Sequence, residues 1–287
     1  MNICISAEST IDLTKEILKE FEIEVIPFNI IMGEKEVLDG EVTPTELFEF
    51  TDKTGKLPHT AAINQYQYEE YFKKLLEKYD HVIHFALSSG ISVACSNAIA
   101  ASHSEELEGK VDIVDTLSLS TGIALQAMYA RKLARAGHSP EEICEAVRAR
   151  VPYDQTSFSL ESVNYLYKGG RCSALAMIGA NLLKIKPEIY VTDGKMGPGA
   201  KYRGPMKKVV LQYVEDTLNK FNNPDKEEIF ITYSSAPEDV VEAVKERLQK
   251  EGFNQIRVTT AGGTISCHCG PHCLGILYLN DGPHPID

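Results

Sequence analysis

Short β-branched runs alternate with helical patterns through the first half of this 287-residue chain. Val82–Leu87 and Val111–Asp115 are largely apolar, which is typical of strands buried on both faces. Two of the helical stretches begin with a capping box that places proline at the first helical position, at Thr43–Glu46 and Ser139–Glu142. Strands that alternate with helices form a parallel sheet covered on both faces. The pattern therefore predicts a doubly wound α/β fold for this half.

The other segments of the first half show either the strand pattern or the helix pattern, apart from the turns between them. We predict a turn at Pro58–Ala62, directly before a helix. In an open parallel sheet, ligands bind beyond the carboxyl ends of the strands, so the loops that follow strands are the first places to look for a site. The remaining predicted strands are Asn2–Ser6 and Glu24–Met32, and the predicted helices are Leu13–Phe21, Pro44–Thr51, Gln65–Lys78, Ser92–Ser104, Leu119–Ala136 and Pro140–Val151.

The alternation ends near Pro152, and a chain of this length usually forms two domains. We therefore predict a doubly wound domain at residues 1–152 and a smaller C-terminal α+β domain at residues 153–287. In the second domain, Asp193–Gly199 is a predicted turn-rich stretch and Ser266–Cys273 a predicted loop. Its predicted strands are Ser157–Leu160, Glu188–Thr192, Glu228–Tyr233, Ile256–Thr260 and Gly275–Tyr278, and its predicted helices are Val163–Lys168, Ala174–Leu183, Met206–Phe221 and Glu238–Lys250.

The chain is acidic, with 29 Lys and Arg against 41 Asp and Glu and a formal net charge of −12. Binding to a nucleic-acid backbone requires clustered positive charge, so we expect no nucleic-acid partner. The sequence shows no signal-peptide pattern and no apolar run long enough to span a bilayer. The seven cysteines are an odd number, and four of them are isolated, as in proteins whose thiols stay reduced. We expect a cytoplasmic protein without stable membrane insertion.

Three segments carry residues suited to binding an anion. Ser88–Ser92 joins an apolar strand to a helix, so its hydroxyls and the helix N–H groups could hold an anion. Thr60 could donate to a carboxylate or cap the helix that follows it. The glycines Gly169 and Gly170 would let the backbone approach a ligand, while Arg171 pairs with a carboxylate or phosphate. A helix end followed by a surface arginine explains that last segment equally well.

Ser266–Cys273 holds three cysteines and two histidines, which are possible zinc ligands. Zinc sites usually combine two distant ligand clusters, and the sequence has no second one. We therefore expect no metal, and predict a Gly-Pro turn that brings His268 to a cleft while Cys267, Cys269 and Cys273 act as packing residues. The motifs GxxxxGK[ST] and strand-GxGxxG are absent, so we expect no nucleotide cofactor.

A series of short segments extends along the whole chain: Glu8–Thr10, Asp39–Gly40, Pro58–Thr60, Ser88–Ser92, Asp115–Thr116, Leu166–Arg171, Leu183–Pro187, Asp193–Gly194 and His268–Pro271. Each segment alone is weak evidence of a relationship to a protein family, but the order and spacing of all the segments together are specific. In this order the chain resembles the DegV family, the bacterial fatty-acid-binding proteins that serve as acyl carriers for a fatty acid kinase.

The resemblance implies a role for four residues. Thr60 and Ser92 would contact the carboxylate of a long-chain fatty acid. Arg171 and His268 would lie near this head group in a cleft between the domains, and the acyl chain would occupy an apolar tunnel in the second domain. The resemblance also implies a binding protein without catalytic residues, which presents the carboxylate to a separate fatty acid kinase and needs no cofactor.

The chain departs from the family's motifs at three places near the expected head group. The family commonly has Thr-Ser-Gln-Pro, Ser-Gly-Thr and Gly-Pro-Gly where this chain has Thr60–Ile63, Ser92–Ala94 and Gly270–His272. The changed residues are Ala61–Ile63, Val93–Ala94 and His272. These differences bear on the head-group contacts and on which lipid is bound, and not on the fold.

Two other functions would use the same residues. An acyl or phosphoryl hydrolase would take Ser92 as nucleophile, His268 as base and Arg171 as oxyanion partner. The segment around Ser92 lacks the GxSxG register of a nucleophile elbow. A metal-sensing module would instead use Cys267–Cys273.

Overall fold

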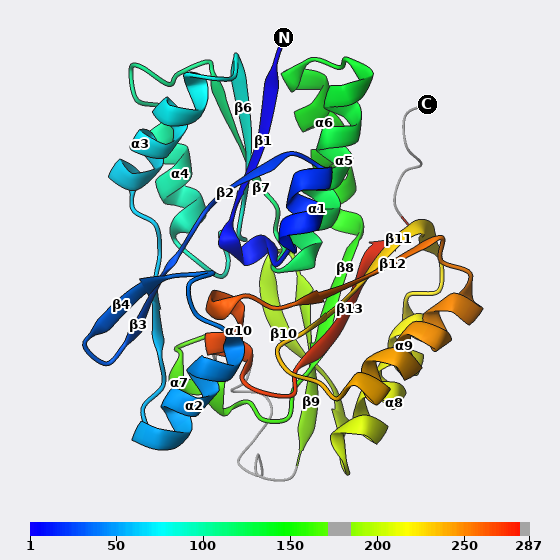
Figure 1. Ribbon diagram of the computed structural model, residues 1–287. Helices are drawn as coiled ribbons and strands as arrows, with labels where there is room; N and C mark the ends of the chain where they lie inside the picture. Colours follow the sequence, from blue (N-terminus) through cyan, green and yellow to red (C-terminus); the bar gives the residue numbers. More distant parts are fainter. Residues whose placement is uncertain (172–184, 282–287) are drawn as a thin grey trace.

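The computed structural model describes residues 1–171 and 185–281, which form three sheets with helices packed around them (Figure 1). A parallel sheet lies at the top of Figure 1, a large mixed sheet at the lower right and a small antiparallel sheet at the lower left. The predicted helix Ala174–Leu183 falls outside the described residues. Within the described ranges, no helix is both long enough and apolar enough to cross a membrane.

The first sheet confirms the doubly wound prediction. Its four strands are all parallel and run in the order β2-β1-β6-β7. One group of helices packs on one face and the other group on the opposite face (Figure 1). The strands are β1 (Ile3–Glu8), β2 (Ile23–Ile26), β6 (His81–Ala86) and β7 (Val111–Asp115), and the helices are α3 (Gln65–Leu76) and α4 (Ala94–Ser102) on one face and α1 (Lys15–Glu20), α5 (Thr121–Ala136) and α6 (Pro140–Arg150) on the other.

The predicted strand Glu24–Met32 is wrong as a single element, because it breaks at Pro27. Its first part is β2, and its second part, β3 (Asn29–Met32), pairs with two strands of the small sheet. Proline has no N–H to donate, so it is suited to the point where the chain leaves one sheet for another. The small sheet has the order β4-β3-β5, with β4 (Lys35–Leu38) and β5 (His59–Ala61), and α2 (Pro44–Thr54) connects these two strands.

The mixed sheet has six strands in the order β10-β9-β8-β13-β11-β12. Most of its neighbours are antiparallel, and only β11 and β12 are parallel, which fits the predicted α+β character. The strands are β8 (Asp154–Ser159), β9 (Lys186–Thr192), β10 (Lys195–Tyr202), β11 (Pro224–Tyr233), β12 (Gln255–Thr260) and β13 (Leu274–Asn280), and the helices of this region are α7 (Asn164–Lys168), α8 (Met206–Lys220), α9 (Glu238–Glu251) and α10 (Gly263–Cys269).

The stretch Asp193–Gly199, predicted to be rich in turns, has its turn at Asp193–Gly194 and continues as a strand of a hairpin. Asp193 and Gly194 both have positive φ, 49° and 74°, and make a tight turn, after which β10 begins and pairs with β9. Pro198 is tolerated because β10 is an edge strand, where a missing N–H need not remove a hydrogen bond between strands. The glycines of this segment indicated a turn but not the strand that follows.

The predicted loop Ser266–Cys273 is also wrong, because its first part lies in α10. The N–H groups at the start of this helix donate hydrogen bonds to two carboxylates from the N-terminal half. Asp12 accepts from Gly262 at 2.7 Å, and Asp39 accepts from Gly263 at 2.7 Å and from Thr264 at 3.1 Å. These carboxylates act as the caps of a helix whose own sequence has no capping side chain.

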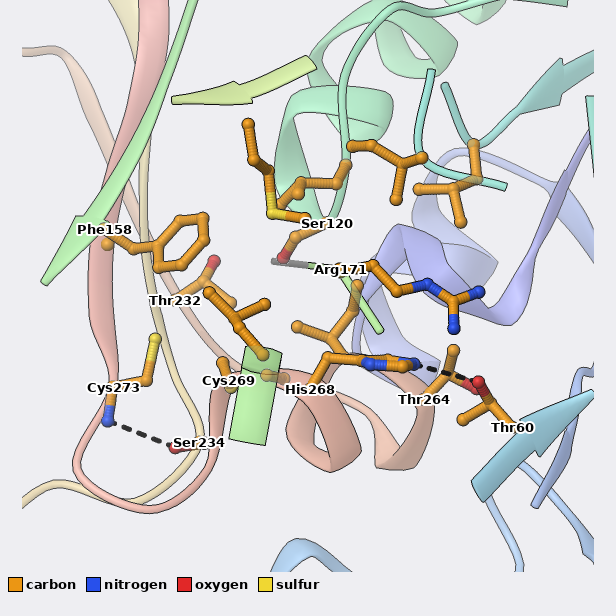
Figure 2. A pocket seen from close by; sticks show the side chains of 18 of the residues that line it. Thr60, Ser120, Phe158, Arg171, Thr232, Ser234, Thr264, His268, Cys269 and Cys273 are labelled. Atoms are coloured by element: carbon orange, nitrogen blue, oxygen red, sulfur yellow. Dashed lines mark hydrogen bonds between the residues drawn. The ribbon is translucent and has the colours of Figure 1, made fainter. Parts of the chain in front are cut away.

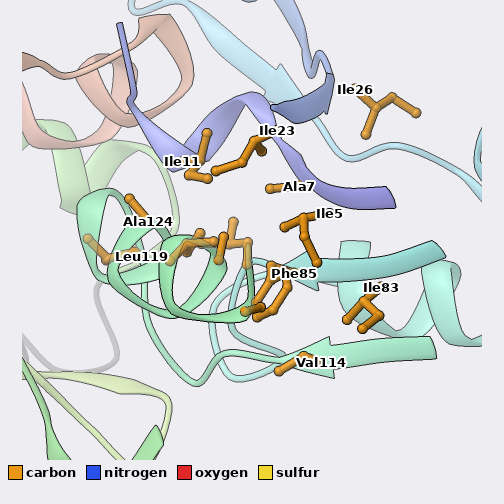
Figure 3. Close-up of a cluster of buried hydrophobic side chains, with 14 of the residues drawn as sticks. Ile5, Ala7, Ile11, Ile23, Ile26, Ile83, Phe85, Val114, Leu119 and Ala124 are labelled. Atoms are coloured by element: carbon orange, nitrogen blue, oxygen red, sulfur yellow. The ribbon is translucent and has the colours of Figure 1, made fainter. Parts of the chain in front are cut away.

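The largest hydrophobic core extends from the parallel sheet into the mixed sheet. Ile5, Phe85 and Val114 of the parallel sheet belong to the same buried cluster as Phe158 and Leu277 of the mixed sheet. Figure 3 shows the part of this cluster between the parallel strands and α5. The two sheets therefore share one apolar interior, which holds the carboxyl ends of β1, β6 and β7 against the mixed sheet. The division into domains at 152 remains a prediction.

Candidate ligand-binding pocket

A largely apolar pocket lies where the parallel sheet, the mixed sheet and α10 meet. It encloses about 770 Å³ of empty space, its opening to solvent included. All four residues predicted from the sequence line it: Thr60, Ser92, Arg171 and His268. The structure thus brings together residues from β5, the β6–α4 turn, the segment after α7, and α10 (Figure 2).

Thr60 and His268 form the central polar contact of this pocket. The Thr60 Oγ1 lies 2.9 Å from the His268 Nε2, and Figure 2 shows this bond on one side of the pocket. Thr60 was predicted to lie in a turn. It lies instead in β5, where it pairs with Ile30 of β3. Burial, the positive charge of Arg171 and the nearby His59 together lower the pKa of His268 to about 4. The imidazole is therefore neutral at pH 7.

Gly169 explains why the His268 ring can take this position. A Cβ at residue 169 would lie 2.6 Å from the His268 Nδ1, so any larger residue would displace the ring. The Nδ1 itself is buried and has no hydrogen-bond partner among the described residues. Gly170, in contrast, has φ +76° with open space around it, so its glycine serves the turn rather than the ring.

Arg171 brings positive charge to this polar side of the pocket. Its Nη1 donates to the carbonyl of Gly169 at 2.9 Å, which directs the side chain over the Thr60–His268 pair (Figure 2). The described residues that line the pocket include no Asp or Glu, and no carboxylate within residues 1–171 and 185–281 forms an ion pair with Arg171. A partly buried guanidinium without a protein counter-charge is a suitable partner for an anionic ligand.

Ser92 lies in the turn between β6 and α4, two residues before the helix begins, and not at the helical position predicted for it. Its Oγ accepts a hydrogen bond from the N–H of Ala94 at 3.2 Å, which leaves the hydroxyl proton available to a ligand. The turn is held by Ser88, whose Oγ donates to the carbonyl of Gly194 in the β9–β10 turn at 2.6 Å. This bond joins the parallel sheet to the mixed sheet beside the pocket.

Sequence reasoning missed Ser120 among the pocket residues. Ser120 precedes α5 with φ 53° and ψ −137°, and its Oγ donates to Asp12 at 2.5 Å. Asp12 is the carboxylate that also accepts from Gly262, so one side chain connects the α5 start to the α10 start. Burial raises the pKa of Asp12 well above its ordinary value. The position of Ser120 just beyond the predicted strand Val111–Asp115 was the signal that could have identified it.

The remaining wall of the pocket is mostly apolar. Its side chains come from both sheets and from α7 and α10, so the apolar space is formed only when all these elements pack together. Burying a hydrocarbon chain there would release apolar surface from water at about 25 cal/mol per Å². The larger apolar residues of the wall are Phe28, Leu87, Ile91, Leu119, Phe158, Leu166, Met196, Ile265 and Leu277.

The three cysteines near the C-terminus have different surroundings. Cys267 packs against Ile30 and Leu47 in a small separate cluster, whereas Cys269 and Cys273 line the pocket. In the part of the chain that the structure describes, no group of three or more His, Cys, Asp or Glu side chains is arranged to hold a metal ion.

Comparison with known proteins gives a consistent result. The family model described as "Uncharacterised protein, DegV family" matches residues 2–281. A protein of Thermotoga maritima named "Fatty acid-binding protein" is 28% identical over 282 residues, covering 96% of this chain and 96% of that protein. A solved "degv lipid binding protein" from the same organism is 26% identical, with a TM-score of 0.84 and coverage of 99% of this chain and 100% of that one.

A third comparison concerns the fold alone, since the identity is 21%. The fatty acid kinase B3 protein of Streptococcus pneumoniae, solved loaded with linoleic acid, has a TM-score of 0.83 and covers 98% of this chain and 100% of its own. These similarities extend over both the parallel sheet and the mixed sheet. With a family match over nearly its whole length, the chain belongs to the DegV family.

Proposed function

We propose that this protein binds a long-chain fatty acid, with the carboxylate at Thr60, Ser92, Arg171 and His268 and the acyl chain in the apolar part of the pocket. The observation that carries the proposal is the position of Arg171. It brings a positive charge to one side of a pocket whose described lining contains no carboxylate. Fatty-acid binding is also named for the Thermotoga maritima relative that this chain resembles.

The two ends of such a ligand would have different tasks. Each buried CH₂ contributes about 0.8 kcal/mol, so the acyl chain would supply most of the affinity. A carboxylate buried without partners is costly, and the hydroxyls of Thr60 and Ser92 together with Arg171 would offset that cost. Because the net charge of the protein is −12, its overall field repels an anion, and these local donors must hold the carboxylate.

We further propose that the bound carboxylate is presented to a separate fatty acid kinase and that this chain performs no catalysis itself. The structural similarity to the fatty acid kinase B3 protein of Streptococcus pneumoniae supports this partner. The polar side of the pocket carries the groups that would hold a carboxylate, whereas the sequence contains neither of the nucleotide-binding motifs GxxxxGK[ST] and strand-GxGxxG. The described cysteines are all free thiols, which fits the reducing cytoplasm where we place this carrier.

The rival hydrolase has less support from the contacts. Its base, His268, is hydrogen-bonded to Thr60, and the Oγ of Ser92 accepts a hydrogen bond from the N–H of Ala94. Within residues 1–171 and 185–281, no hydrogen bond joins Ser92 to His268. A hydrolase needs that bond to activate the serine.

Native mass spectrometry of the purified protein tests the proposal. We expect a non-covalent adduct with the mass of a long-chain fatty acid, which is lost on delipidation and regained when a fatty acid is added. The matching fatty acid methyl ester should bind more weakly, because it has the chain but not the charge. A protein that is free of lipid and ignores added fatty acids would contradict the proposal. Stoichiometric labelling of Ser92 by a fluorophosphonate would favour the hydrolase instead.

A further inference from the structure

Cys269 and Cys273 place two thiols side by side in the wall of the pocket. Cys269 is the last residue of α10, and Cys273 directly precedes β13. Both line the pocket, where Figure 2 shows them with Phe158 and Thr232 around them. The two residues are four positions apart, and the neighbouring Cys269 together with burial raises the pKa of Cys273 well above its ordinary value. The carboxylate-binding proposal does not use either of them.

A tight turn holds the two thiols together. Gly270 and His272 have positive φ, 72° and 58°, so the chain reverses between the cysteines. The Ser234 Oγ donates to the carbonyl of Gly270 at 2.6 Å and accepts from the N–H of Cys273 at 3.3 Å. One buried hydroxyl thus bridges the two ends of the turn, which keeps the pair in contact without a covalent bond.

The surroundings of the pair differ from those of the neighbouring Cys267. Cys269 and Cys273 are only 4% and 6% exposed, and the empty space they adjoin is the pocket itself. The neighbouring Cys267 belongs to the same helix but packs against Ile30 and Leu47 instead. A small reagent therefore reaches Cys269 and Cys273 through the pocket, and a ligand that fills the pocket would cover them.

We propose that Cys269 and Cys273 form a reversible disulfide, a modification site whose formation is blocked when the pocket is filled. The oxidant is a peroxide. One thiol attacks a peroxide oxygen, becomes a sulfenic acid and releases water; the second thiol then attacks the sulfenic sulfur and releases a second water. The sum is two thiols and hydrogen peroxide giving one disulfide and two waters, and a dithiol reverses it.

The site links the redox state of the protein to its ligand occupancy. The neighbouring Cys269 and burial raise the pKa of Cys273 well above its ordinary value, so oxidation of the empty protein is slow at neutral pH but not prevented. Filling the pocket removes the route by which peroxide arrives. This second step rests on the proposed function, because it requires the acyl chain to lie against Cys269 and Cys273.

The first test uses the delipidated full chain and hydrogen peroxide. After denaturation and alkylation, we expect two fewer modified thiols than in the reduced chain, which has seven, and full recovery with dithiothreitol. The tryptic peptide 258–287 contains no Lys or Arg and three cysteines, and in it only Cys267 should carry the alkyl group. This mapping needs no variant. Alkylation of all three cysteines in this peptide after peroxide treatment would overturn the proposal.

Variants supply the matched controls. Cys269→Ser and Cys273→Ser should each abolish the loss of two thiols, whereas Cys267→Ser should leave it unchanged. A disulfide that persists in Cys269→Ser or Cys273→Ser, or that disappears in Cys267→Ser, would contradict the assignment of the pair.

The second test repeats the oxidation with a long-chain fatty acid already bound. We expect the rate of thiol loss to fall by about tenfold or more, because oxidation then waits for the ligand-free fraction. If the empty protein forms the disulfide and a bound fatty acid gives no protection, the ligand-controlled step is overturned while the thiol pair stands. If no fatty acid binds at all, the proposed function fails, and the first test still decides the disulfide.

Discussion

The hydroxyl of Thr60 lies 2.9 Å from the Nε2 of His268, although 208 residues separate them in the chain. The bond joins β5 of the small sheet to α10, and it places both side chains on the polar side of the apolar pocket. Arg171 extends over this pair from the segment after α7 (Figure 2). Three distant parts of the sequence therefore meet on one side of the pocket, where we propose that the carboxylate binds.

Replacing the two hydroxyls tests the head-group contacts. Thr60→Ala and Ser92→Ala should each weaken fatty-acid binding by about ten- to a hundredfold, since a hydrogen bond to a charged group contributes about 1.5–3 kcal/mol. Ser89→Ala is the matched control, because Ser89 lies in the same turn as Ser92 but is exposed. Titration with a fluorescent fatty acid measures the three affinities. If the double variant Thr60→Ala/Ser92→Ala binds lipid as well as the wild type, the assignment of these two residues to the head group is refuted.

Removing the charge of Arg171 should affect the acid and not the hydrocarbon. We expect Arg171→Met to weaken binding of a fatty acid about tenfold or more, and to change binding of the matching fatty alcohol little, because a charge-assisted bond is lost only with the acid. Isothermal titration with both ligands gives the ratio. A variant that loses affinity for the acid and the alcohol equally would mean that Arg171 contributes packing and not charge.

Gly169 and Gly170 allow a steric test within one turn. In Gly169→Ala, the new Cβ would lie 2.6 Å from the His268 Nδ1, so the ring must move and fatty-acid binding should weaken. Gly170→Asn is the control, because residue 170 has open space and asparagine tolerates positive φ. Circular dichroism should show that both variants fold. Comparable losses of affinity in the two variants would argue against a special role of the Gly169–His268 contact.

The carboxylate of Asp39 should be needed for stability of α10. It accepts the N–H groups of Gly263 and Thr264, and in Asp39→Asn the amide would turn a donor toward one of them. We expect a loss of about 1–3 kcal/mol in the free energy of unfolding, measured in urea. Asp52→Asn, an exposed change on α2, should have little effect. An Asp39→Asn protein as stable as the wild type would show that the helix does not depend on this cap.

The low pKa of His268 gives a pH dependence with a defined sign. Burial lowers this pKa to about 4, whereas the unfolded chain has an ordinary value near 6.5. Between these values the unfolded state binds a proton that the folded state does not, so His268 makes stability fall as pH drops from about 6.5 toward 4. Full loss would correspond to about 3 kcal/mol.

Urea unfolding at pH 7, 6 and 5 measures how the free energy of unfolding changes with pH. This slope should be smaller in His268→Gln, because glutamine does not titrate. Asp12, whose buried carboxyl has a raised pKa, contributes with the opposite sign and is present in both proteins. The comparison of wild type and variant therefore isolates His268. Identical slopes in the two proteins would exclude a depressed His268 pKa.

Several local patterns led directly to the structure. The capping boxes at Thr43 and Ser139 both form as predicted, each with proline in the first turn. The strand Val111–Asp115 was predicted with its observed bounds, and the helix after it ends at Gly137 as expected. These predictions succeed because a capping box, a buried apolar run and a glycine helix end depend on residues close in sequence.

Two of the errors have a common cause. The strand break at Pro27 and the helix α10 depend on partners from distant segments. The start of α10 illustrates this most clearly, because its caps Asp12 and Asp39 lie more than 200 residues before it. Periodicity within a short window contains no information about such partners.

By itself the sequence determined the alternation of strands and helices, the acidic charge and the residues that we propose as carboxylate ligands. Those properties are local or additive, so they can be read along the chain. Only the tertiary structure decided that Thr60, Ser92, Arg171 and His268 line one pocket, that Gly169 makes room for the His268 ring, and that Cys269 and Cys273 line the same pocket. The physical reason is that these contacts form when the shared apolar core packs the parallel sheet against the mixed sheet.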